Sequence, residues 1–228
     1  MPAAARDRQF PLCRMTVTAF LTLLQGAAVT LLISCAGIAL GVPLSLALAL
    51  SRWGQVPVLA QVAAFYVSLL RSTPAVTLCL LIFFAVPTLG IEISAWTAAI
   101  STLALITAAF NCEIWRAGLM NFPKDQLEAA RAFGMLPTQR FRLIIFPQLW
   151  RAALPGLVNE ATLLIKASPA IAVIGVAELT RAATRIGAQT YDPLPPMIAA
   201  TAIYVAIIVI LVGLQRFTDQ RYGKREAE

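Results

Sequence analysis

The chain has 228 residues, of which 59% are hydrophobic and only 13% are charged. A soluble domain normally carries about 25% charged residues, so a chain this apolar is expected to be integral to a membrane. The net charge of +7 is not arranged as a basic stripe with interleaved aromatic residues, so no nucleic acid is expected as a partner. The lack of histidine argues against His-based metal sites and His-assisted catalysis. The sequence contains no P-loop motif, so it is not expected to bind ATP through one.

Apolar stretches recur along the chain, and a membrane-spanning helix needs roughly 20 such residues. The candidate spans are 27–50, 72–91, 95–115, 152–177 and 195–215. A shorter apolar run at 57–70 is interrupted by Arg71, and we expect it to begin a long or bent second helix. The sequence therefore predicts an all-α integral membrane fold with about five transmembrane helices.

The segments around these spans complete the expected domain organisation. Residues 1–25 are predicted to form an N-terminal segment, part of which lies along the membrane interface. Residues 26–217 are predicted to form the transmembrane domain, and residues 218–228 a basic cytoplasmic tail.

The positions of Lys and Arg predict the orientation, because cytoplasmic loops are enriched in these residues. With the N-terminus outside and the C-terminus inside, twelve of the cations lie inside and five outside. The N-out, C-in topology is therefore favoured. It makes residues 116–151 the largest cytoplasmic loop.

This loop carries several signals for helix starts and stops. Asn121 is expected to cap a helix that has Pro123 in its first turn, and Gly134 to end it. Pro137 is expected to start a second short helix, which Pro147 limits before the fourth span. The predicted product is two short helices meeting at a bend. Such a unit is either a docking element for another protein or an ordinary solvated loop.

The same loop resembles the EAA motif of binding-protein-dependent ABC importer permeases, which reads E-A-A, three residues, G, nine residues, I-x-L-P. The one departure is Phe146, where leucine is usual. The resemblance implies that this motif contacts an ATPase through Glu128, Ala129, Ala130, Gly134, Ile144 and Pro147.

Further segments resemble the permeases of polar amino acid ABC importers, of the histidine/glutamine/arginine/opine type. They are "LLRSTPAVTLCLLIFF" (69–84), "EIWRAGLMNFPKDQLEAARAFGM" (113–135) and "LPGLVNEATLLIKASPAIAVIGVAELTR" (154–181). The resemblance implies the type I ABC importer permease fold. It also implies a subunit of the bacterial inner membrane that translocates amino acids and is not itself an enzyme.

The resemblance also implies the partners. A dimer of ABC ATPases would dock on the 123–147 loop and carry ATP and Mg, with no cofactor on this chain. A second permease subunit, identical or different, would complete the pore within the lipid bilayer. An extracytoplasmic solute-binding protein would deliver the substrate.

Lys166 is the most informative charge within the spans, because it lies about 20 Å into the fourth predicted helix. An ionisable residue at that depth is a candidate functional residue. Lys166 and Ser168 are therefore predicted to contact a substrate carboxylate, and the alternative is a structural lysine at a subunit interface. Related permeases often have Asp or Asn where this chain has Ala167, which weakly disfavours substrates with a cationic side chain.

Other polar residues have expected structural or gating roles. Glu113 and Arg116 are three residues apart and are expected to pair on one helix. Asn159 and Glu160 are expected either to bond across helices or to face the cavity. Arg71 is expected to belong to a turn where the second helix bends, with substrate contact as the alternative.

Three other functions compete with an amino acid permease. An ABC permease for another small solute is compatible with the same motifs. An ion-coupled secondary transporter usually has internal repeats and more spans, neither of which the sequence has. A membrane enzyme needs a convergent set of titratable groups, and the absence of histidine and the isolated position of Lys166 argue against one.

Overall fold

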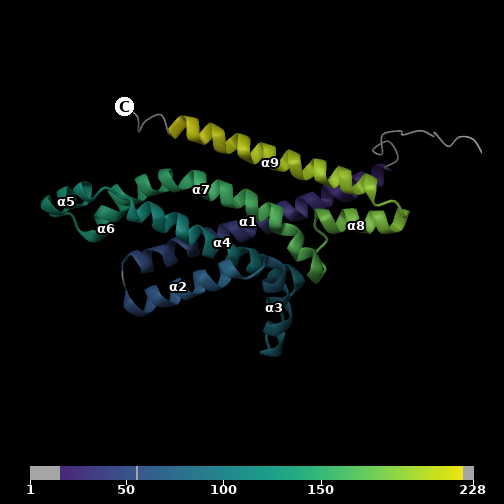
Figure 1. Ribbon diagram of the computed structural model, residues 1–228, viewed down its shortest axis with the longest axis horizontal. Coiled ribbons are helices and arrows are strands. Elements are labelled where there is room, and N and C mark those ends of the chain that lie inside the picture. Colours follow the sequence, from purple (N-terminus) through teal and green to yellow (C-terminus); the bar gives the residue numbers. More distant parts are fainter. Residues whose placement is uncertain (1–15, 55, 223–228) are drawn as a thin grey trace, which may run out of the picture.

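The computed structural model describes residues 16–54 and 56–222, and every regular element in them is helical. The helices, most of which Figure 1 labels, are α1 (Val17–Trp53), α2 (Pro57–Ser72), α3 (Ala75–Thr88), α4 (Ala95–Met120), α5 (Lys124–Ala132), α6 (Pro137–Arg140), α7 (Phe146–Ala167), α8 (Leu179–Thr190) and α9 (Leu194–Tyr222). A π-helical turn, Phe141–Ile145, joins α6 to α7, and a 3-10 segment, Ser168–Ile174, follows α7.

Five helices, α1, α2, α4, α7 and α9, run along the long axis of the molecule and alternate in direction (Figure 1). Four helical stretches are individually long and apolar enough to cross a membrane, and α2 with α3 supplies a fifth crossing if the bent pair counts as one. The helices α5 and α6 and the end of α9 lie at one end of the molecule, and α1 begins at the other. The predicted number of spans and the placement of the two chain ends on opposite sides agree with this arrangement.

The centre of the fold is the packing of α1 against α4, which two glycines of α1 make close. A Cβ atom at Gly41 would lie 2.5 Å from the Thr107 Cβ atom, and one at Gly37 would lie 2.7 Å from the Leu103 Cβ atom. Both approaches are shorter than atoms of these types tolerate. Small residues therefore set the α1–α4 distance, as is typical of membrane helices.

Several helix ends differ from the expected ones. Residues 17–25 are the first turns of α1 rather than a separate segment, and α9 continues to Tyr222, into the expected tail. The remaining parts of these terminal segments, 1–15 and 223–228, lie outside the described residues. Helical structure is continuous from Pro137 to Ile174 through the π-helical turn, so the fourth long helix begins at Pro137 rather than near 152.

The turn that precedes this helix corrects two predictions. Asn121 ends α4 and does not cap α5, whose N-cap residue is Pro123. Pro147 does not end a helix, although it has no backbone N–H to donate. A π-helical turn precedes it, in which the Phe146 N–H bonds the Phe141 carbonyl five residues back, and the helix continues through this turn. One short helix, α5, is therefore followed by a bend and by the start of the fourth long helix.

Gly134 ends α5 as predicted. Its φ of 72° lies in the left-handed region, where glycine is favoured. The Met135 N–H bonds the Ala130 carbonyl at 3.1 Å, and the Gly134 N–H bonds the Arg131 carbonyl at 2.9 Å. This pair of bonds is the Schellman motif, which satisfies carbonyl groups at the end of the helix.

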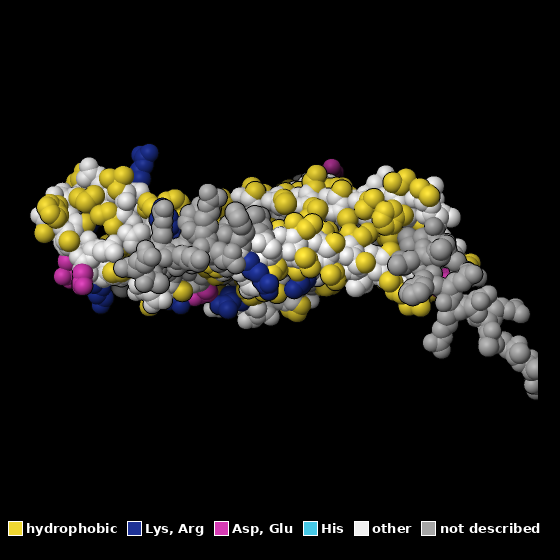
Figure 2. Space-filling view, turned by 90° about the horizontal axis from the view of Figure 1, so that it is seen from above, with side chains coloured by type: hydrophobic (Ala, Val, Ile, Leu, Met, Phe, Trp, Pro, Cys, Tyr) yellow, Lys and Arg dark blue, Asp and Glu magenta, His cyan; other side chains and the backbone are white. Residues whose placement is uncertain are grey.

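Hydrophobic side chains cover much of the surface seen from the α9 side in Figure 2. Large apolar side chains are exposed on several helices, among them Leu40, Phe65, Phe84 and Val209. On this face, the Lys and Arg side chains of the described residues lie near the middle and toward the end with α5 and α6. The N-out, C-in orientation, which would place α5 and α6 on the cytoplasmic side, stays a prediction.

Candidate functional site

Two helix breaks lie next to each other in the molecule. The helix of α2 stops at Ser72, and α3 leaves it at 112° after Thr73 and Pro74. The other break follows α7, where Pro169 removes a backbone donor and the chain tightens into the 3-10 segment. This segment packs against α3 in a shared apolar cluster. Broken helices that meet inside a membrane commonly form the binding sites of transporters.

Opposite charges flank the first break. Arg71, next to the last residue of α2, has its guanidinium carbon 5.4 Å from the centre of the Phe110 ring on α4. The half-buried Glu160 of α7 lies within electrostatic range of Arg71. The ion pairs found in residues 16–54 and 56–222 involve neither of them. The predicted turn at Arg71 is present, and it brings this arginine near a carboxylate with which it does not pair.

Lys166 and Ser168 do not share one surface. Lys166, near the end of α7, is exposed. Ser168 is fully buried, and its hydroxyl lies 3.4 Å from the Tyr204 hydroxyl on α9. The Ile165 carbonyl, to which Pro169 has no N–H to donate, accepts a bond from the Ser168 N–H instead. Lys166 thus remains a candidate substrate contact, while the Ser168 hydroxyl faces the protein interior.

Glu178 and Tyr204 were given no role by the sequence, yet they meet at the second break. Glu178 is fully buried and caps α8, where its carboxylate accepts bonds from two backbone N–H groups. The Tyr204 hydroxyl donates to the same carboxylate at 2.9 Å. The signal available in the sequence was an acidic residue that follows the apolar run "AIAVIGVA" (170–177).

Glu113 forms the ion pair that was predicted and one that was not. Its carboxylate accepts a bond from Arg116 Nε at 2.8 Å, within α4. It also bonds Arg52, at the end of α1. Both arginines and the glutamate are partly buried. This three-residue cluster joins α1 to α4 near the end of the molecule that carries α5.

The residues of the EAA motif differ in exposure. Glu128, Ala129 and Gly134 are exposed, whereas Ala130 is buried and packs inward, so the two alanines do not form one open face. Ile144 is half-buried and Pro147 is exposed. Next to them, the apolar side chains of Phe133 and Leu136 are 87% and 63% exposed. An exposed apolar tip on a polar turn is typical of a protein-binding surface.

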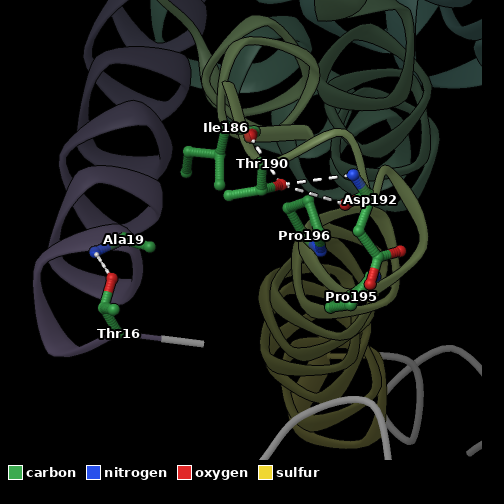
Figure 3. Close-up of a pocket in the computed structure, with 7 residues that line it drawn as sticks. All are labelled: Thr16, Ala19, Ile186, Thr190, Asp192, Pro195 and Pro196. Atoms are coloured by element: carbon green, nitrogen blue, oxygen red, sulfur yellow. Dashed lines mark hydrogen bonds between the residues drawn. The ribbon is translucent and has the colours of Figure 1, made fainter. Parts of the chain in front are cut away.

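A crevice of about 220 Å³ lies at the opposite end of the molecule, between the start of α1 and the turn from α8 to α9 (Figure 3). The Thr190 hydroxyl donates to the Ile186 carbonyl at 3.0 Å and accepts a bond from the Asp192 N–H at 3.4 Å. Across the crevice, Thr16 caps α1. Its lining residues are Thr16, Ala19, Ile186, Thr190, Asp192, Pro195 and Pro196. This crevice contains neither the helix breaks nor the charges beside them.

Residues 41–224 match the family described as "Binding-protein-dependent transport system inner membrane component". The chain belongs to this family. It is therefore a membrane-spanning permease subunit of the bacterial inner membrane, of a family that works with ATPase subunits.

The sequence relatives are transport proteins that align with this chain over most of their length. The chain is 35% identical to the probable amino-acid ABC transporter permease protein YckA of Bacillus subtilis, over 92% of this chain and 93% of the relative. It is 34% identical to the arginine transport system permease protein ArtQ of the same organism, over 87% and 91%. It is 35% identical to the octopine transport system permease protein OccM of Rhizobium meliloti, over 86% and 83%.

Solved structures confirm the predicted type I importer permease fold. A chain from the crystal structure of an amino acid ABC transporter with histidines superimposes with a TM-score of 0.82 at 33% identity, covering 91% of this chain and all of the other. A chain of the MetNI methionine ABC transporter in an inward-facing conformation gives 0.69 at 22% identity, which supports the fold alone.

Proposed function

We propose that this permease subunit carries amino acids across the inner membrane, and that its translocation site lies where the two helix breaks meet. The amino acid transport named for its relatives supports the substrate class. The observation that carries the proposal is the placement of Arg71 and Glu160, opposite charges that lie near each other within the spans without an ion pair.

The chemistry of an amino acid zwitterion fits these two groups. A guanidinium binds a carboxylate through charge-assisted hydrogen bonds, so Arg71 is assigned to the α-carboxylate. Glu160 is assigned to the α-ammonium group, and Phe110 gives the arginine a fixed aromatic neighbour. Arg71 is exposed and Glu160 is half-buried, so neither charge is enclosed by apolar side chains and both can be reached by a ligand. The open pair leaves room for a ligand that satisfies both charges.

Residues of α7 extend the site toward the substrate side chain. Asn159 and Lys166 are both exposed and lie seven residues apart, which places them on one face of the helix. Ala167, beside Lys166, supplies no carboxylate for a cationic side chain. The proposed substrates are therefore amino acids with neutral or acidic side chains rather than arginine or lysine.

The proposed partners follow from the division of labour in this family. ATP and Mg bind to a separate ATPase dimer that docks on α5 and the following bend, and this chain hydrolyses nothing and holds no cofactor. A second permease subunit completes the pore, because the exposed apolar and charged faces of α7 need a partner. A solute-binding protein delivers the substrate from the extracytoplasmic side.

Uptake by the purified complex tests the proposal. The tagged chain is purified with its partners, reconstituted into vesicles and supplied with labelled amino acids, ATP and binding protein. The expected result is ATP-dependent uptake of an amino acid with a neutral or acidic side chain. Uptake that an ion gradient drives without ATP would instead identify a secondary transporter. Uptake of another class of solute alone would refute the amino acid assignment.

The first prediction concerns the two charges of the site. Arg71→Gln and Glu160→Gln each remove a charged partner of the zwitterion, so each is expected to raise the KM of uptake about tenfold or more. Arg151→Gln is the matched control, because Arg151 is exposed on α7 away from the breaks. Unchanged KM values in both site variants would contradict the assignment.

A further inference from the structure

A buried hydrogen-bond cluster joins α8 to α9 beside the second helix break. Glu178 accepts bonds from the backbone N–H groups of Thr180 at 2.9 Å and Arg181 at 2.6 Å. The Tyr204 hydroxyl donates to Glu178 at 2.9 Å. Glu178 has no ion pair within residues 16–54 and 56–222, so its polar partners there are these hydrogen-bond donors at the start of α8 and on α9.

The Tyr204 hydroxyl contacts both sides of the break. On one side lies the hydroxyl of Ser168, the first residue of the 3-10 segment, at 3.4 Å. On the other side lies the hydroxyl of Thr180 in the first turn of α8, at 3.2 Å. Tyr204 stands midway along the apolar span Leu194–Gly213. One side chain of α9 thus holds the end of α7 and the start of α8 at a fixed separation, near the middle of a span.

Stability alone does not explain this buried hydrogen-bond cluster. A buried carboxylate loses its hydration, and apolar side chains of similar volume hold helices together at least as well. The same helices already share an apolar cluster that includes Leu179, Ala183 and Ala200. What hydrogen bonds add to such packing is a defined geometry, because they have preferred distances and directions.

We propose that Glu178 and Tyr204 are positioning residues of the transport site. The 3-10 segment that they anchor packs against α3, which begins directly after the break at Arg71. Anchoring this segment to α9 therefore sets the distance between the break near Arg71 and the break near Lys166. This inference rests on the proposed function, because it assigns the substrate to the space between those breaks.

Tyr204→Phe tests the proposal with a matched control. The variant removes one hydroxyl, and Tyr66→Phe removes another, which donates to the Leu105 carbonyl of α4 at 2.9 Å rather than to a residue of either break. Tyr66→Phe loses one partly buried hydrogen bond, whereas Tyr204→Phe loses the bond to Glu178 and the contacts with the Ser168 and Thr180 hydroxyls, so Tyr204→Phe should lose at least as much thermal stability. Only Tyr204→Phe is expected to raise the KM of uptake, by about three- to tenfold.

The outcomes separate this inference from the proposed function. A wild-type complex that takes up no amino acid refutes the proposed function and this inference with it. Wild-type uptake with an unchanged KM in Tyr204→Phe, or an equal rise in Tyr66→Phe, refutes the inference alone. If Tyr204→Phe does not assemble, Thr180→Val decides, because it removes only the hydroxyl beside Tyr204. A KM raised about threefold then supports positioning, and an unchanged KM refutes it.

Discussion

Glu113 shows how a single charged residue acts at the boundary of the spans. It bonds Arg116 on its own helix and Arg52 on α1, so one carboxylate satisfies two cations. The partner on α4 was predictable from the spacing of three residues. The partner on α1 was not, because pairing between distant parts of a chain depends on how the helices pack.

The second prediction follows from this cluster. Glu113→Gln leaves Arg52 and Arg116 without an anionic partner, so the variant is expected to lose about 2 kcal/mol of stability. Thermal unfolding of the purified protein in detergent measures the loss. Glu92→Gln is the control, because Glu92 is exposed between α3 and α4 and has no ion pair within the described residues. Equal melting temperatures for the two variants would contradict a stabilising role of the cluster.

Residues of the candidate site were predictable to the extent that they stand out from apolar surroundings. Arg71, Glu160 and Lys166 are charges in or beside long apolar runs, so the sequence alone marks them. Tyr204 was missed because tyrosine is common in membrane helices, and only the fold brings it to Glu178. Ser168 was assigned to the substrate because it lies close to Lys166 in the sequence, but residues two positions apart on a helix point in different directions.

At the scale of helices, the long apolar runs predicted the number of spans, and proline and glycine residues indicated the helix breaks. The bend at Pro74 and the left-handed end at Gly134 follow from backbone restrictions that these residues impose. The π-helical turn before Pro147 was not predictable, because a proline is compatible with either a helix end or a distorted helix. Gly175 ends the 3-10 segment with a φ of 98°, and no atom lies within 4 Å of the place that a Cβ would occupy.

The third prediction concerns the packing of α1 against α4. Gly41→Ala places a methyl group 2.5 Å from the Thr107 Cβ atom and 2.7 Å from the Ala104 carbonyl oxygen. Such overpacking is expected to cost about 1–3 kcal/mol of stability. Gly213→Ala is the control, because it lies in α9 with open space around it and gains helix propensity. A Gly41→Ala protein that melts as high as Gly213→Ala would contradict the close approach.

At the scale of the whole molecule, the two ends of the helical bundle differ in character. One end carries α5, the exposed Phe133 and Leu136, and the Glu113 cluster, while the other carries the crevice of Figure 3. The helix breaks and their charges lie between the ends. The proposed function assigns these three regions in turn: the α5 end to the ATPase, the helix breaks to the substrate, and the opposite end to the solute-binding protein.

The most direct test of this account is whether an ATPase binds at the α5 turn. Gly134 and Gly90 both have a positive φ, 72° and 80°, and neither has an atom within 4 Å of an added Cβ. Valine at either position therefore imposes similar backbone strain, but only Gly134 lies beside α5 (Figure 1). The wild-type chain and both variants are tagged, extracted in mild detergent and purified with bound proteins. The account predicts that a P-loop ATPase accompanies the wild type and Gly90→Val and is lost from Gly134→Val. An ATPase that binds all three equally, or none of them after crosslinking, would contradict it.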